Sequence, residues 1–144
     1  MEANIYVGGC LCGRLRFEAS GPPNRVTHCH CFMCRRQTGA AVATFAGFRT
    51  GESFRWSKGK AAVYRSSATV RRSFCRRCGT PLAYEAELYE SEIYLAISAF
   101  DEPDRLPPGS HVHVAQKIAW FDTADDLPRY RHADPEVRTK KPPP

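Results

Sequence analysis

Apolar and polar residues alternate along much of this chain with the period of β-strands. In RLRFEAS the apolar Leu15, Phe17 and Ala19 alternate with polar residues, as expected for a strand with one buried face. EIYLAIS, residues 92–98, follows the same half-buried pattern. Shorter β-prone runs, punctuated by glycines, are VATFAGF, SFRW, AAVYR, TVRRSF, PLAYEA and KIAWF. The pattern predicts a mainly β fold.

Helical periodicity is short and local. CRRQTGAA, which begins at Cys34, is compatible with one helical turn, and no long helical pattern follows it. We expect the WF pair that contains Trp120 to lie in the core. Residues 1–131 are predicted to form one compact domain without internal repeats. The Pro- and Lys-rich tail, residues 132–144, is predicted to be disordered.

Composition supports a globular protein. The 144 residues are enough to bury a core, and a content of 42% hydrophobic and 25% charged residues argues against a disordered chain. The start, MEANIYVGG, lacks the basic and apolar runs of a secretory signal, and no stretch approaches the roughly 18 apolar residues of a membrane span. We therefore expect a soluble cytoplasmic protein with no membrane partner.

Seven cysteines require an explanation in such a chain. The cytosol keeps thiols reduced and an odd number cannot be fully paired, so metal ligation explains them better than disulfides. Ligation also changes the formal net charge of +6, because seven thiolates and two zinc ions would add −7 + 4 = −3 and leave +3. Much of the basicity flanks cysteines, which weakens the case for a nucleic-acid partner. These cations are Arg35, Arg36, Arg71, Arg72, Arg76 and Arg77.

Four cysteines form two closely spaced pairs that suit a closed metal site. GGCLCG supplies Cys10 and Cys12, and FCRRCGTP supplies Cys75 and Cys78, followed by a glycine that suits a tight zinc-knuckle turn. Zinc with four thiolate ligands is tetrahedral, with Zn–S bonds of about 2.3 Å and no position left for chemistry. The spacing therefore predicts a structural zinc that ties the amino-terminal strand to a distant turn.

The other three cysteines, in HCHCFMC, leave a fourth metal position undecided. If this stretch is extended, Cys29 and Cys31 face one side of the strand while His28 and His30 face the other. With Cys34, the cluster then offers three thiolates. Catalytic zinc sites commonly have three protein ligands and one exchangeable position, which water or substrate occupies.

Two alternatives to an open site stay possible from spacing alone. His111 or His113 could complete a second closed structural site. The three thiols could instead form a redox-active cluster.

Four segments resemble the successive motifs of the glutathione-dependent formaldehyde-activating enzyme (GFA) family, which also includes centromere protein V. The segments are GGCLCGRLRF, HCHCFMCRRQTGA, FCRRCGTPL and HVHVAQKIAWFDTADDLPRY. The resemblance runs from about Val7 to Tyr130, and all seven cysteines fall where that family places its zinc ligands.

The resemblance implies a fold, two metals and an activity. The fold is of the Mss4-like β-tent type, with one structural zinc on the four-cysteine set and one catalytic zinc on Cys29, Cys31 and Cys34. The family's named activity is the formation of S-hydroxymethylglutathione from formaldehyde and glutathione, which is classed with carbon–sulfur lyases. The expected partners are a small thiol such as glutathione and an aldehyde.

The chemistry of an open three-thiolate zinc suits that activity. Our hypothesis is that a small thiol enters the fourth position as a thiolate and that its sulfur adds to an aldehyde carbon. Arg35, Arg36 and Lys117 are candidates for binding the carboxylates of glutathione. His111 is a candidate catalytic residue that would donate a proton to the developing alkoxide.

An alternative function belongs to another class of protein. The arginine doublets and the net positive charge are compatible with a non-catalytic zinc module that binds protein or nucleic acid, although no long basic tract or nucleic-acid motif is present. A third hypothesis is a thiol redox sensor with metal-free cysteines. The sequence leaves the oligomeric state and the identity of the aldehyde open.

Overall fold

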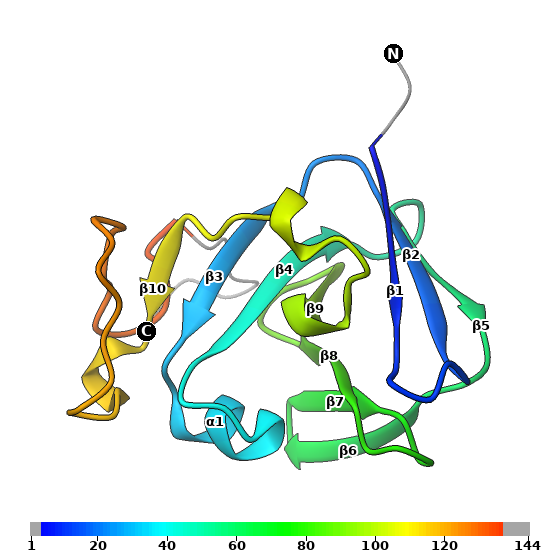
Figure 1. The fold of residues 1–144 in the computed structure, drawn as a ribbon, viewed down its shortest axis with the longest axis horizontal. Coiled ribbons are helices and arrows are strands. Elements are labelled where there is room, and N and C mark those ends of the chain that lie inside the picture. The colour runs from blue at the N-terminus through cyan, green and yellow to red at the C-terminus, as the bar shows by residue number, and fades with distance from the viewer. Residues whose placement is uncertain (1–3, 137–144) are drawn as a thin grey trace.

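Two β-sheets meet along an aromatic core in the computed structural model, which describes residues 4–136 (Figure 1). The three-stranded sheet has the order β1-β2-β5, with β1 at Ile5–Gly9, β2 at Arg16–Ser20 and β5 at Phe54–Lys58. The seven-stranded sheet has the order β10-β3-β4-β9-β8-β7-β6. Its strands are β3 (Arg25–Cys29), β4 (Ala43–Arg49), β6 (Ala62–Ser67), β7 (Val70–Phe74), β8 (Pro81–Ala86), β9 (Glu92–Ala96) and β10 (Ser110–Val112). The predicted mainly β, single-domain fold is confirmed.

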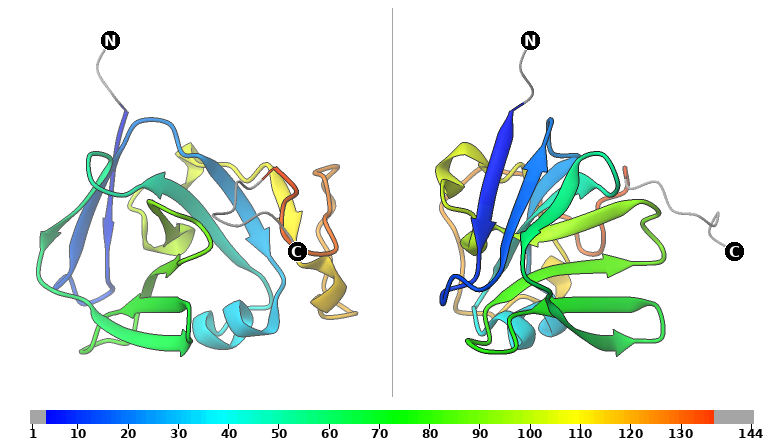
Figure 2. Two further views of the ribbon diagram at one scale, coloured as in Figure 1. Left: turned by 180° about the vertical axis from the view of Figure 1, so that it is seen from behind. Right: turned by 90° about the vertical axis from the view of Figure 1, so that its right-hand side faces the viewer.

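Strand pairing brings distant segments together. Most neighbouring strands run antiparallel, but β10 pairs in parallel with β3, with Val112 opposite Cys29. Short 3₁₀ turns connect the later segments; they are η1 (Ile97–Ala99), η2 (Pro103–Arg105) and η3 (Val114–Gln116). Figure 2 shows the β1-β2-β5 sheet standing beside the larger sheet. Within residues 4–136, the helices are all too short or too polar to cross a membrane.

The aromatic core confirms the alternation predicted for β2. Phe17 is fully buried, its ring centroid lies 5.1 Å from that of Phe100, and its strand neighbours Leu15 and Ala19 are also buried. EIYLAIS differs from its prediction, because β9 buries both of its faces and ends at Ala96. The strand lies between β4 and β8 in the large sheet, and the rings of Tyr84 and Tyr89 cover Tyr94, with centroid distances of 4.8 and 5.5 Å.

The prediction of a strand at KIAWF, with Trp120 buried in the core, is wrong. KIAWF lies in an irregular segment after η3, where the Lys117 N–H donates to the carbonyl of Val114. Trp120 is 80% exposed and does not belong to the core. The apolar pattern of this segment failed as a predictor because a strand also needs a neighbouring strand to receive its backbone hydrogen bonds.

The single α-helix of residues 4–136, α1 (Phe32–Thr38), is longer than the one turn predicted after Cys34. Cys31 is its N-cap, and the Cys31 sulfur accepts a hydrogen bond from the Cys34 N–H at 3.3 Å. Gly39 ends the helix with a φ of 71°, and its N–H donates to the carbonyl of Arg35. Figure 1 places α1 at the foot of the large sheet, beside β6 and β7.

The predicted tail begins inside the described part of the chain. The His113 N–H donates to the His132 carbonyl, and Asp134 lies 3.6 Å from a guanidinium nitrogen of Arg25. The rest of the predicted tail, residues 137–144, lies outside the described residues. The division into a domain and a disordered tail stays a prediction.

Candidate metal centres

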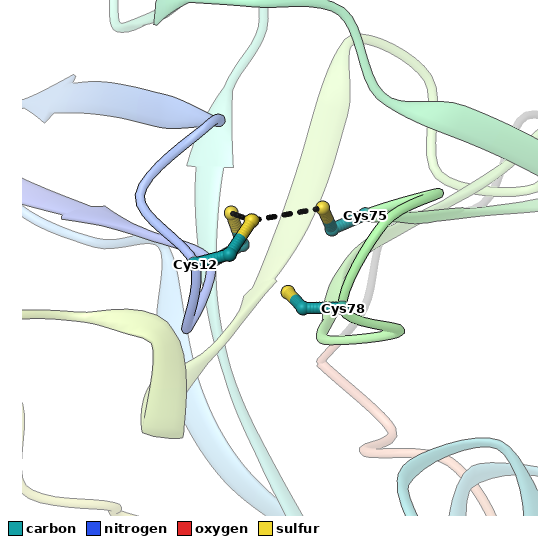
Figure 3. Close-up of side chains that lie close together, drawn as sticks. Cys12, Cys75 and Cys78 are labelled. Carbon is teal, nitrogen blue, oxygen red and sulfur yellow. Dashed lines mark hydrogen bonds between the residues drawn. The ribbon is translucent and has the colours of Figure 1, made fainter.

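The four paired cysteines converge from two turns of the chain. Their sulfur atoms all lie within 4.8 Å of one another, with 3.6 Å between Cys10 and Cys12 and 3.7 Å between Cys12 and Cys75. A tetrahedral zinc with Zn–S bonds of about 2.3 Å has ligand sulfurs about 3.8 Å apart. Figure 3 shows Cys12 and Cys75 facing each other, with Cys78 beside them. The four sulfurs fit a zinc ion.

Local hydrogen bonds hold the sulfurs in place. The Leu15 N–H donates to the Cys10 sulfur at 3.2 Å, and the hydroxyl of Thr80 lies 3.1 Å from the Cys78 sulfur. Hydrogen bonding from Thr80 lowers the pKa of Cys78 to about 5, which favours the thiolate that a metal requires. Gly79 has a φ of 79°, so the predicted need for glycine after the second C-x-x-C cysteine is confirmed.

The other three cysteines meet where β3 turns into α1. Cys29 ends the strand, Cys31 caps the helix, and Cys34 lies in its first turn. Their sulfur atoms lie within 4.8 Å of one another, and all three side chains are buried. The end of β3 and the start of α1 therefore bring the three sulfurs of the C-x-C-x-x-C motif together without any distant segment.

The cysteines of this cluster have shifted pKa values, and the shifts of Cys29 and Cys31 have opposite directions. Hydrogen bonding with Cys31 and Cys34, followed by burial, raises the pKa of Cys29 far above its ordinary value. The same contacts lower the pKa of Cys31, because its thiolate accepts hydrogen bonds from Cys29 and Cys34. The cluster thus holds a buried thiolate with neighbouring thiols, which is a donor set suited to a soft metal such as zinc.

Arg72 is the site residue that sequence reasoning had treated only as a charge-balancing cation. Its two terminal guanidinium nitrogens each lie 3.7 Å from the Cys34 sulfur, and its Nε donates to the Ser66 hydroxyl at 3.2 Å. The side chain is only 4% exposed, and its guanidinium lies 5.4 Å from the centroid of the Tyr84 ring. In β7, alternation places Arg72 on the same face as the apolar Val70 and Phe74, and this signal could have predicted that Arg72 is buried.

The histidines next to the cysteines lie away from the sulfur cluster. The rings of His28 and His30 both contact His111, with centroid distances of 4.7 and 5.1 Å. In the part of the chain that the structure describes, no histidine or carboxylate joins Cys29, Cys31 and Cys34 within the distance that groups the three sulfurs. Neither His111 nor His113 therefore supplies the fourth ligand in this structure.

His111 uses both ring nitrogens in a buried network. Its Nε2 lies 3.1 Å from the Asp125 carboxylate, and its Nδ1 lies 2.8 Å from Nε2 of His30. Hydrogen bonding from Thr123, and also from His111, keeps the pKa of Asp125 well below its usual range, so this carboxylate accepts. We therefore assign the His111 proton to Nε2, and the His30 Nε2–H then donates to His111.

The three predicted carboxylate-binding cations occupy different surroundings. Arg35 donates to the backbone carbonyls of His30 and Gln116, at 3.2 and 3.1 Å. Lys117 donates to the carbonyl of Phe121 at 3.0 Å. Arg36 has no such backbone bond among the described residues, and its guanidinium lies 5.6 Å from the centroid of the Phe32 ring.

A groove runs from Arg36 to Arg72. It has a volume of about 350 Å³, and Phe32 and Met33 of α1 line it opposite Tyr64 of β6. These apolar side chains are unusually exposed, at 47%, 40% and 63%. We call this feature the α1–β6 groove. It connects the protein surface with the guanidinium that contacts Cys34.

A second hollow lies beside the four-cysteine cluster. It has a volume of about 480 Å³, and Cys75 lines it together with four cations. Within residues 4–136, none of these cations forms an ion pair. They are Arg14, Lys60, Arg76 and Arg77. We call this feature the cationic cleft.

Comparisons with known proteins show which family and which fold this chain resembles. The sequence model of a family described as glutathione-dependent formaldehyde-activating enzyme matches residues 5–116, which include all seven cysteines. An uncharacterized lyase of Schizosaccharomyces pombe is 31% identical over 121 residues, covering 83% of this chain and 86% of that protein. The crystal structure of a Rhodobacter sphaeroides protein superposes with a TM-score of 0.55 at 19% identity, covering 86% of this chain and 98% of the other. The last likeness shows a shared fold.

Proposed function

Because the chain belongs to the glutathione-dependent formaldehyde-activating enzyme family, we propose that it is a zinc-dependent carbon–sulfur lyase. Its substrate is the adduct of glutathione, or another small thiol, with formaldehyde or another aldehyde. The observation that carries this proposal is the cluster of Cys29, Cys31 and Cys34, which has no fourth protein ligand among the described residues. Three thiolates leave one position of a tetrahedral zinc for an exchangeable ligand.

The two cysteine clusters take different roles in this proposal. Cys10, Cys12, Cys75 and Cys78 hold a structural zinc, because four thiolates close its coordination. Zinc on the three-sulfur cluster supplies a site that lowers the pKa of a bound thiol and keeps it as a thiolate. The family's zinc chemistry supports both roles.

The protein's own residues bind and orient the substrate. Arg36, at the surface end of the α1–β6 groove, pairs with a carboxylate of the thiol. Arg35 and Lys117 have donors engaged by backbone carbonyls, so they hold the loops around α1 and η3. His111 lies in the network on the other side of β3, and we assign it a positioning role for His30 and the turn that presents Cys29 and Cys31.

The proposed reaction balances without a redox partner. In the synthetic direction a C–S bond forms between the thiol sulfur and the aldehyde carbon, and the C=O π electrons move to the oxygen. The thiol proton ends on that oxygen, which gives the S-hydroxyalkyl adduct. The lyase direction breaks the same C–S bond and returns the proton to sulfur.

Exchange NMR with ¹³C-labelled formaldehyde and glutathione tests this function. The uncatalysed reaction is appreciable, so the measured quantity is the exchange rate between free aldehyde and adduct as a function of enzyme concentration. We expect a linear increase for the wild type and the uncatalysed rate for Cys34→Ser with an intact four-cysteine site. Protein with both sites loaded that accelerates neither formaldehyde nor a panel of longer aldehydes would overturn the proposal.

The cationic cleft favours a second candidate function, the binding of nucleic acid by a non-catalytic zinc module. Arg76 and Arg77 lie next to each other in this cleft without ion pairs among the described residues. Fluorescence anisotropy with a labelled DNA duplex would then show affinity that falls steeply with salt and weakens in an R76A/R77A variant. A duplex that fails to bind at about 50 mM salt would exclude this function.

A further inference from the structure

A full positive charge is buried against the three-sulfur cluster. The guanidinium of Arg72 lies 3.7 Å from the Cys34 sulfur through both terminal nitrogens, and the side chain is 4% exposed. Its third nitrogen, Nε, donates to the Ser66 hydroxyl, and the guanidinium lies 5.4 Å from the centroid of the Tyr84 ring. Burying a charge is costly unless a partner of opposite charge compensates it. The three-sulfur cluster, which Arg72 contacts through the Cys34 sulfur, is the partner that the structure places there.

The charge count of the loaded site explains this arrangement. Three thiolates and a zinc ion carry −3 + 2 = −1, and Arg72 brings the total to zero. An anionic fourth ligand then leaves the assembly at −1, whereas without Arg72 the same ligand would leave −2. A neutral fourth ligand changes neither total. In a buried site these differences act through a low effective dielectric constant, so they are large compared with surface charges.

We infer that Arg72 makes the fourth position beside Cys29, Cys31 and Cys34 selective for an anionic ligand, which identifies the bound form of the substrate as a thiolate. This inference rests on the proposed function. In that function, Arg72 is the residue that determines the preference for an anionic ligand.

The α1–β6 groove reaches Arg72, the residue whose guanidinium contacts the Cys34 sulfur. Arg72 lines the inner part of the groove, while Arg36 lies in the same groove near Phe32. A thiol that carries a carboxylate can therefore meet one cation at the surface and a second cation at the cluster. Its apolar carbons would lie against Phe32, Met33 and Tyr64, which are otherwise left in solvent.

The chain contains a matched control next to Arg72. Arg71 is on the opposite face of β7, where its side chain is 51% exposed and pairs with Glu85 at 3.2 Å. Replacing Arg71 removes the same formal charge from the same strand without touching the cluster. Any effect of total charge or of strand stability should therefore appear in both variants.

Ligand titrations of the cobalt-substituted protein test the inference without measuring activity. Cobalt in the three-sulfur site reports its ligands through visible d–d and thiolate charge-transfer bands. The probes are 2-mercaptoethanol, which binds metals as the thiolate, and imidazole, which binds as a neutral molecule. The proteins are the wild type, Arg72→Gln, Arg72→Lys and Arg71→Gln, each compared at full occupancy of both sites.

We expect Arg72→Gln to weaken 2-mercaptoethanol binding at least tenfold and to change imidazole binding less than twofold. Arg72→Lys, which keeps the charge, should retain most of the thiolate affinity, and Arg71→Gln should behave like the wild type.

Two results would overturn the inference. One is an Arg72→Gln protein that loses affinity for both probes equally or for neither, because the charge would then not select the ligand. The other is equal loss of cobalt from Arg72→Gln and Arg72→Lys, because packing rather than charge would then matter. If the wild-type protein binds no thiol, the proposed function is wrong, and the inference about Arg72 is wrong with it.

Discussion

The sulfur atoms of Cys12 and Cys75 lie 3.7 Å apart although 63 residues separate them along the chain. This contact joins the turn between β1 and β2 to the turn between β7 and β8, and so ties the small sheet to the far end of the large one. A metal held there stabilises a long-range connection that would otherwise depend on packing alone.

The first prediction concerns the four-cysteine cluster. Cys75→Ser should lower the melting temperature by about 10 °C, because losing a ligand of a structural zinc removes the binding energy that stabilises the fold. Differential scanning calorimetry would measure the change. Cys34→Ser, in the other cluster, serves as the control and should lower the melting temperature less. Equal effects of the two variants would contradict the division into structural and open sites.

The second prediction concerns metal content. Native mass spectrometry should find two zinc ions per chain, and Cys31→Ser should retain one, because each cluster binds its ion through its own cysteines. A chelator should remove zinc first from the three-sulfur site, which has fewer ligands. One ion in the wild type, or the loss of both from Cys31→Ser, would be incompatible with two independent sites.

The third prediction separates binding of the thiol's carboxylates from binding of its sulfur. Arg36→Ala should raise the apparent Kd of glutathione about two- to fivefold, which is the usual contribution of an exposed ion pair. The Kd of 2-mercaptoethanol, which has no carboxylate, should not change. Gln37→Ala removes another side chain that lines the groove and is the control. Equal changes for both thiols would remove Arg36 from the carboxylate-binding role.

The fourth prediction concerns His111. Because both ring nitrogens are hydrogen-bonded and the side chain is 1% exposed, His111→Gln should reduce the free energy of unfolding by about 1–3 kcal/mol. Exchange rates per folded, zinc-loaded protein should stay within about threefold of the wild type. A loss of about a hundredfold or more at unchanged stability and zinc content would instead identify His111 as a general acid.

The spacing of the cysteines and the alternation of apolar residues predicted much of the fold and of the metal centres. Spacing grouped the cysteines into the two clusters, of which the three-sulfur cluster is local and the other joins two distant turns. The alternation of apolar residues found most strands of the two sheets. The pattern missed β1, β3 and β10. Burial along β3 does not alternate, and the three residues of β10 are too few to show a period. The pattern also predicted a strand around Trp120 that lacks a pairing partner. No local pattern could report the contact between Arg72 and Cys34, which are 38 residues apart and meet only when β7 packs near α1.

The order of these parts along the chain has a consequence for biosynthesis. Residues 29–34 contain the whole three-sulfur cluster, whereas the four-cysteine cluster needs Cys78 and the charge of the smaller cluster needs Arg72. A chain emerging from the ribosome amino-terminus first therefore exposes a complete metal-binding motif before its counter-charge and its structural clasp have been synthesised. An ion captured at that stage would occupy a solvated, flexible loop, and the same ion would become buried and electrically balanced only when β7 joins the sheet.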